Sequence, residues 1–209
     1  MSLPTYLDLP VLSWRPDWSP PSPSHEVRSL KERLETPGGR FADDPLYETI
    51  TRRARMVRYV VKGRTAIEAA RTALLEEIQG RLKPFWLVSW TPDLQLTAEL
   101  AIGAVDLTVT PLGYDRFLAG EDKGHLHLAL WPRSNGGEPV YRQITGNSVE
   151  AGAEVLTLDS PLEVLLDQRD PVCWLALSRL DSDEVVIRWE NMDVATLELP
   201  IIDLPLESS

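Results

Sequence analysis

Apolar residues along this chain recur with helical spacing in one segment and with strand-like spacing in most of the rest. The helical segment covers residues 64–80, where an apolar stripe falls on one face. Thr65 can cap the start of this helix, and Gly80 is suited to its end because glycine tolerates a left-handed backbone. The pattern predicts one main helix at about 64–80. The stripe consists of Ile67, Ala70, Leu74, Leu75 and Ile78.

Strand-like segments lie on both sides of the predicted helix. Residues 47–61 are rich in β-branched and aromatic positions, and residues 84–90 form a compact apolar run. From Leu94 onward, short strand patterns recur at intervals of about eight to twelve residues with turn residues between them, which favours a sandwich or barrel. These later strands are predicted at residues 94–101, 106–112, 125–131, 140–150, 154–159, 173–180 and 184–202.

The first 45 residues differ from the rest of the chain in their proline content. Eight prolines interrupt any long helix or central strand, so the sequence predicts an extended arm. Residues 26–35 can form a short helix within this arm, with Ser24 as a candidate cap. The arm also carries Trp14 and Trp18, and aromatic residues are common anchors of interfaces. We therefore expect the arm to dock on a partner.

Together these patterns predict an α+β fold that is mainly antiparallel β. The strands are expected to form sandwich- or barrel-like modules, joined by one main helix and an extended N-terminal arm. The expected division is a docking arm at residues 1–45, a strand–helix–strand unit at 46–97 and a β-module at 98–209. Deletion of residues 1–23 is expected to leave a folded domain and to abolish assembly.

Charge is distributed unevenly along the chain. The net charge of −11 argues against a general nucleic-acid binder, because phosphate contacts need a basic surface. Residues 52–83 contain nine basic and three acidic residues, whereas residues 150–209 contain fourteen acidic residues and three arginines. These segments can join neighbouring copies face to face, or they can neutralise each other within one fold. The candidate interface residues are Trp14, Trp18, Arg52, Arg53, Arg55 and Arg58.

No segment has the pattern of a membrane span or a secretion signal. The apolar runs are too short to cross a bilayer, and the N-terminus lacks a basic start followed by an apolar stretch. We therefore expect a protein that is made in, and assembled from, the cytoplasm. The single cysteine, Cys173, lies in an apolar run and is expected to be a small buried residue.

Candidate chemical sites are few. His125 and His127 are two residues apart, so on a strand they share a face and can share a metal ion, but a third ligand is not evident. Neighbouring acidic residues diverge on a strand or a helix and do not form a catalytic pair. A phosphate loop requires glycines directly before a helix, but the glycines at 136–137 lie between predicted strands. The sequence therefore predicts neither an enzyme nor a cofactor or metal site.

Seven tryptophans leave a second function open. A carbohydrate-binding β-sandwich displays exposed aromatic side chains as stacking platforms. This alternative expects Trp86, Trp131 or Trp174 to be exposed on one face of a sheet. Most of the tryptophans lie within apolar strands, which favours burial in the core.

The order of segments resembles that of tail-tip or baseplate structural proteins of tailed bacteriophages. The segments are LSWRPDWSPP, FWLVSWTPDLQL and YRQITGNSVEAGAEVLTLDSPL, with the helix before the second, and the resemblance covers about residues 14–161. It implies a non-enzymatic virion subunit that forms a ring or collar, and joins the tail tube to hub or fibre proteins. It also implies partners that are other copies of the chain and neighbouring tail proteins, with assembly in the host cytoplasm. The long proline-rich start and the acidic second half depart from a distal-tail pattern.

Overall fold

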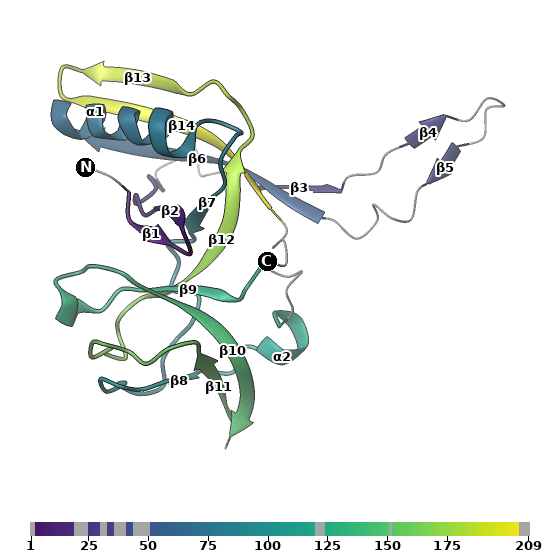
Figure 1. Ribbon diagram of the computed structural model, residues 1–209, viewed down its shortest axis with the longest axis vertical. Helices are drawn as coiled ribbons and strands as arrows, with labels where there is room; N and C mark the ends of the chain where they lie inside the picture. The colour runs from purple at the N-terminus through teal and green to yellow at the C-terminus, as the bar shows by residue number, and fades with distance from the viewer. Residues whose placement is uncertain are drawn as a thin grey trace. The chain divides into compact units, whose positions relative to one another are not determined.

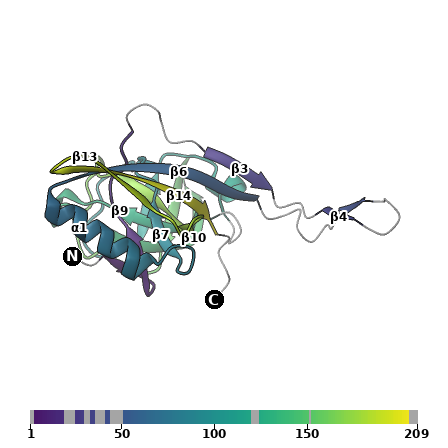
Figure 2. The ribbon, with the colours of Figure 1, turned by 90° about the horizontal axis from the view of Figure 1, so that it is seen from above.

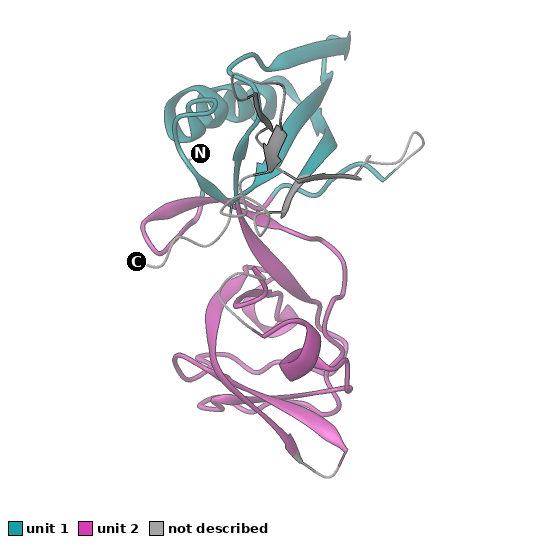
Figure 3. Cartoon of the chain, turned by 90° about the vertical axis from the view of Figure 1, so that its right-hand side faces the viewer, with its two compact units in different colours: residues 1–3, 14–85, 178–205 teal, residues 4–13, 86–177, 206–209 magenta. Residues whose placement is uncertain are grey.

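The chain forms two compact units in the computed structural model, which describes residues 3–18, 25–29, 33–35, 41–43, 51–119, 124–150 and 152–204. Unit 1 comprises residues 1–3, 14–85 and 178–205, and unit 2 comprises residues 4–13, 86–177 and 206–209 (Figure 3). The fold is mainly antiparallel β with one main helix in the described part, which confirms the predicted fold class.

An antiparallel sheet forms the body of unit 1. Its central strand is β14 (Val194–Asp203), which pairs with β6 (Thr51–Lys62) along one side. The other side of β14 pairs first with β13 (Val186–Asn191) and then with the end of β12 (Val172–Leu180). The segment predicted as one strand at 184–202 is therefore a hairpin.

One face of this sheet is covered by the main helix (Figures 1 and 2). Helix α1 (Arg64–Thr72) continues as the wider π-helical turns of η2 (Ala73–Ile78), which confirms the helix predicted at about 64–80. The helix ends where Gln79 and Gly80 adopt left-handed φ angles of 55° and 64°. The buried residues from helix and sheet include Ile67, Ala70, Leu74, Ile78, Val57, Tyr59, Ala195, Leu197, Leu199 and Ile201.

The opposite face of the unit 1 sheet carries apolar side chains that are exposed. Met56 and Val60 alternate along β6 with the buried Val57 and Tyr59, so they point to the uncovered face. Val186 of β13 is also exposed, and lies opposite Glu198 in the pairing register. Within the described residues, no helix covers these three side chains.

Two strand pairs involve residues 25–55. Strand β3 (His25–Ser29) pairs with the first residues of β6, and β4 (Arg33–Glu35) pairs with β5 (Phe41–Asp43) as a separate two-stranded sheet (Figures 1 and 2). These two pairs are together called the two-stranded ribbon. The prediction of a short helix at 26–35 is therefore wrong for the described residues 26–29 and 33–35, and residues 30–32 lie outside the described part. Pairing with β6 and β5 supplies the backbone hydrogen bonds that the local helical pattern would have formed.

Unit 2 contains a closed ring of strands. Strand β9 (His127–Leu130) pairs with β10 (Val140–Glu150), β10 with β11 (Ala153–Leu158), and β11 with β8 (Asp106–Val109). Leu96 then bridges to Val109, Leu94 bridges to Val172, and β12 pairs with β9 to close the ring. The predicted barrel-like module is thus present. Its interior includes Leu94, Leu96, Leu107, Val109, Leu128, Leu130, Ile144, Leu156, Leu166 and Val172.

Three further strands extend the sheet of unit 2. Strand β1 (Thr5–Tyr6) pairs with β2 (Leu9–Leu12), which runs parallel to β7 (Phe85–Val88), and β7 adjoins β12. Val11 is fully buried beside Trp86, Ala129 and Cys173 in a second core cluster. The N-terminal segment is therefore a component of this chain's own sheet.

The units differ from the division expected from the sequence. Residues 5–12 were expected in a docking arm, but they contribute buried positions to unit 2. Residues 178–205 were expected in the β-module, but they supply the central strand of unit 1. The cause is long-range strand pairing, which no local pattern specifies.

Candidate assembly surfaces

The predicted interface arginines of β6 whose side chains are described form ion pairs with acidic residues of the same chain. The guanidinium of Arg55 forms an ion pair with Asp203. Arg58 lies 2.7 Å from a carboxylate oxygen of Asp17, whose backbone N–H also donates to the carbonyl of Arg58 at 2.8 Å. Residues of the N-terminal segment therefore lie along β6 of unit 1.

The two tryptophans of the predicted interface lie in different surroundings. Trp14 packs edge-on against Tyr59, with ring centroids 5.8 Å apart. Trp18 exposes nearly half of its side chain. Arg52 and Arg53 belong to β6, where they pair with residues of β3, and their side chains lie outside the described part.

Contacts between the basic and acidic segments occur within one chain. Besides the Arg55–Asp203 pair, the backbone N–H of Arg81 donates to Oδ1 of Asp183 at 3.0 Å, and its guanidinium donates to the carbonyl of Asp181. At these positions the two segments neutralise each other within the fold, which was one of the two sequence-based alternatives.

His125 and His127 contact different groups. His127 is buried, with its ring 4.4 Å from that of Trp86 and its Nδ1 atom 3.0 Å from the hydroxyl of Tyr6. His125 precedes β9 and packs edge-on against Trp174, 5.2 Å away between centroids. Within the described residues, no three potential ligands gather around a metal position.

An aromatic cluster in unit 2 packs against the N-terminal hairpin, which consists of β1 and β2. The ring of Tyr6 lies between those of Trp86, His127 and Tyr141, with centroids 5.5–5.6 Å apart, and the indole N–H of Trp86 donates to the Tyr6 carbonyl. Burial lowers the pKa of His127 to about 4 and raises the pKa of Tyr6, with Asp159 opposing the first shift and adding to the second. The imidazole is therefore neutral near pH 7, and Nδ1 can accept the Tyr6 hydroxyl.

The turn between β1 and β2 has an unusual composition. Tyr6 pairs with Leu9, and the two residues between them, Leu7 and Asp8, have φ angles of 47° and 61°. Two successive positive φ values define a type I′ turn, in which Asn–Gly is strongly preferred. A leucine in this conformation costs about 1–2 kcal/mol, yet 56% of the Leu7 side chain is exposed. Packing against the described residues does not account for the leucine.

A second turn holds a tryptophan pair. The Asp93 carboxylate accepts hydrogen bonds from the hydroxyls of Ser89 and Thr91 and from the backbone N–H of Trp174. Between Ser89 and Asp93, Trp90 is held at φ 56°, with its ring 4.5 Å from that of Trp131. The three acceptor contacts of Asp93 stabilise a turn that tryptophan does not favour.

The tryptophans named for glycan stacking are mostly covered. Trp86 is buried, and Trp131 and Trp174 are half-buried. Trp189 on β13, which the sequence did not single out, exposes about half of its side chain.

A groove of about 500 Å³ lies in unit 1, between the end of the helix and the segment before β13. A Cβ atom at Gly80 would lie 2.8 Å from Oδ1 of Asp183, so glycine is needed for this close approach. Leu75 projects at this site with 63% of its side chain exposed. The groove is lined by Arg71, Leu74, Leu75, Gln79, Gly80, Asp183, Glu184, Val185 and Ile187.

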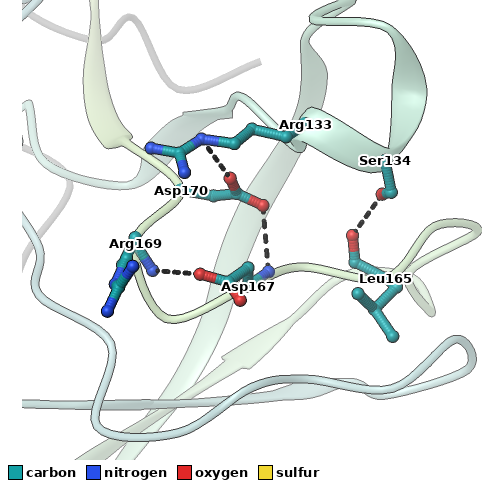
Figure 4. Close-up of polar contacts among 6 residues, drawn as sticks. All are labelled: Arg133, Ser134, Leu165, Asp167, Arg169 and Asp170. Atoms are coloured by element: carbon teal, nitrogen blue, oxygen red, sulfur yellow. Dashed lines mark hydrogen bonds and ion pairs between the residues drawn. The ribbon is translucent and has the colours of Figure 1, made fainter.

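A buried carboxylate orders one loop of unit 2 (Figure 4). The Asp170 side chain is 1% exposed, accepts the backbone N–H of Asp167 at 2.9 Å, and lies 3.5 Å from the Nε atom of Arg133. Nearby, the Ser134 hydroxyl donates to the Leu165 carbonyl. These contacts connect the turn after β9 to the loop before β12. A structural role explains all of them, so we assign this cluster no further function.

No protein-family model and no curated protein matches this chain. None of the helices in the described part combines the length and apolar character that crossing a membrane requires.

Proposed function

We propose that this chain is a non-enzymatic structural subunit of a phage tail tip or baseplate. In this role it forms a ring or collar with other copies of itself and joins the tail tube to hub or fibre proteins. The kind of assembly is proposed from the sequence resemblance alone. The observation that carries the assembly role itself is the two-stranded ribbon of unit 1.

The ribbon supports this proposal because an isolated pair of strands has little stability of its own. Strands β4 and β5 pair only with each other among the described strands. Two-stranded ribbons are marginal in water, and their unpaired edges invite pairing with another chain. A neighbouring subunit would supply the missing contacts.

The uncovered face of the unit 1 sheet supports the same role. Met56, Val60 and Val186 are exposed on one face, next to the Arg58–Asp17 ion pair. Apolar residues beside paired charges are typical of interfaces, in which an apolar centre is surrounded by a polar rim.

A shortened ribbon tests the proposal. Ser29 pairs with Thr51, so replacing residues 30–50 by Asn–Gly closes the hairpin in the existing register. We expect this variant to keep the circular dichroism spectrum and melting temperature of a folded chain, but to lose self-association or incorporation with the products of neighbouring genes. Light-scattering mass measurements provide the readout.

The full chain serves as its own reference in this experiment. If it remains a monomer at high concentration and with its neighbours' products, the ring role is contradicted. Assembly of the shortened variant to the wild-type mass would contradict the role of the ribbon. Binding of the monomer to a glycan array would favour the carbohydrate-binding alternative.

A further inference from the structure

The β1–β2 turn combines features that point to a contact outside its own unit. Leu7 occupies a position in which asparagine is preferred, and its side chain is mostly exposed. The strands that flank the turn are anchored in unit 2, because Tyr6 contacts His127 and Trp86 and because Val11 is fully buried. A strained residue on a rigid support suits a preorganised binding element.

The groove of unit 1 has complementary features. Its walls include Leu74, Leu75, Val185 and Ile187, and its volume of about 500 Å³ can admit a leucine side chain. Arg71 lies on its rim and is mostly exposed, with a 3.6 Å contact to the equally exposed Glu68. The groove therefore offers apolar walls for a leucine and a cation for an adjacent carboxylate.

We infer that the Leu7–Asp8 turn of one copy inserts into this groove of a second copy. Leu7 packs between Leu75 and Ile187, and the Asp8 carboxylate lies on the Arg71 side of the rim. The segment before β13, which lines the groove together with the helix, carries Asp183 and Glu184, and Oδ1 of Asp183 already accepts the backbone N–H of Arg81. This charge pattern sets the direction in which the turn enters.

The contact joins two different surfaces, because the turn belongs to unit 2 and the groove to unit 1. It is heterologous unless two copies insert their turns into each other's grooves. Heterologous contacts build rings when the rotation between copies closes, and filaments when it does not. The inference rests on the proposed function, since it assumes that copies of the chain associate. It names two surfaces that join them.

The first test replaces the turn by the sequence that its backbone prefers. The L7N/D8G variant relieves the strain of the leucine, so its melting temperature is expected to rise by about 2–4 °C. The same variant loses the inserted side chain, so its self-association is expected to weaken about tenfold or more. A more stable protein that assembles less well separates docking from folding. As a matched control, I102N changes another exposed apolar residue and should leave association unchanged.

The second test mixes two variants. L75E places a charge in the groove at an exposed helix position, and L82E is its control at an exposed leucine outside the groove. L75E alone and L7N/D8G alone should both be impaired. Their equimolar mixture retains one intact turn and one intact groove, so it should form pairs of chains and no larger species, as measured by light scattering.

The outcomes distinguish this inference from the proposed function. If the wild type associates and L7N/D8G associates equally well, the turn is not the contact and the inference fails, while the structural role stands. The inference also fails if both variants are impaired and their mixture stays monomeric. If the wild type never associates with itself, the ring and the inference fail together.

Discussion

The hydroxyl of Tyr6 lies 3.0 Å from Nδ1 of His127, so the N-terminal hairpin is hydrogen-bonded to the first residue of barrel strand β9. Both residues lie in an aromatic cluster in which His127 is buried and Tyr6 is partly buried. This bond joins segments that are 121 residues apart in the sequence.

Removal of the Tyr6 hydroxyl should destabilise unit 2. Y6F leaves the buried Nδ1 of His127 without its donor, which is expected to lower the free energy of unfolding by about 1–2 kcal/mol in urea titrations. Y141F is the matched control, because the buried hydroxyl of Tyr141 has no hydrogen-bond partner in the described part of the chain. Its removal should cost nothing, and equal losses in the two variants would contradict the assignment.

The buried imidazole should make stability depend on pH. Burial lowers the pKa of His127 to about 4, from 6.5 for an exposed histidine. Between these values the unfolded chain holds a proton that the folded chain lacks, so the free energy of unfolding falls as pH decreases from about 6.5 to about 4.

A glutamine at position 127 isolates this effect, because it accepts a hydrogen bond from Tyr6 but does not titrate. The stability of the wild type relative to H127Q should decrease by up to about 1.4 kcal/mol per pH unit over this window. Urea titrations at several pH values between 4 and 7 measure the difference. Parallel curves for the two proteins would show that His127 is not the group responsible.

Asp93 should prove necessary for the tryptophan pair. D93A removes the acceptor for Ser89, Thr91 and Trp174, so we expect a loss of about 2–3 kcal/mol. The near-ultraviolet circular dichroism of the Trp90–Trp131 contact should also weaken. D106A is a control, because exposed Asp106 accepts one side-chain hydrogen bond, from Thr157. A normal dichroism spectrum in D93A would refute the role assigned to this turn.

The two members of the Arg133–Asp170 pair should differ in importance. D170A removes a buried carboxylate that accepts the N–H of Asp167, so its expected cost is about 2–3 kcal/mol. R133A removes a side chain that is 69% exposed, so its expected cost is about 1 kcal/mol or less, and should shrink with salt. Thermal melts at low and high salt compare them. A larger loss for R133A would contradict this order.

Truncation of the N-terminus should destabilise unit 2. The sequence suggested that deletion of residues 1–23 leaves a folded domain, but this deletion removes β1, β2 and the fully buried Val11 and Leu12. Loss of buried leucine-sized side chains costs several kcal/mol each, so we expect partial unfolding with exposure of apolar surface. Binding of a hydrophobic dye measures this exposure, and an unchanged melting curve would restore the idea of a separate arm.

The main helix could be predicted because its apolar residues repeat at helical spacing and are buried on one face. The barrel strands followed from their alternation, which is clearest in β11. The hairpin between β13 and β14 was missed because Met192–Asp193 carries no glycine or proline. The residue that could have indicated this turn is Asn191, whose side chain accepts the N–H of Asp193 and so favours a turn.

The candidate surfaces were less predictable, because they depend on residues that are distant in the sequence. Arg55 and Asp203 are 148 positions apart, and local patterns show neither their pairing nor the central place of β14. The Leu7–Asp8 turn was missed because its residues are atypical of type I′ turns. The groove needs Gly80 beside Asp183, a contact that only the folded chain reveals.

The position of β14 has a consequence for synthesis on the ribosome. This strand is central to unit 1, yet it follows the whole of residues 86–177 in the chain. While unit 2 emerges, β6 and α1 have no central strand to pair or pack with, so the groove and the uncovered face of unit 1 are not yet formed. A nascent or prematurely terminated chain therefore lacks both surfaces, and cannot make the proposed contacts with finished subunits.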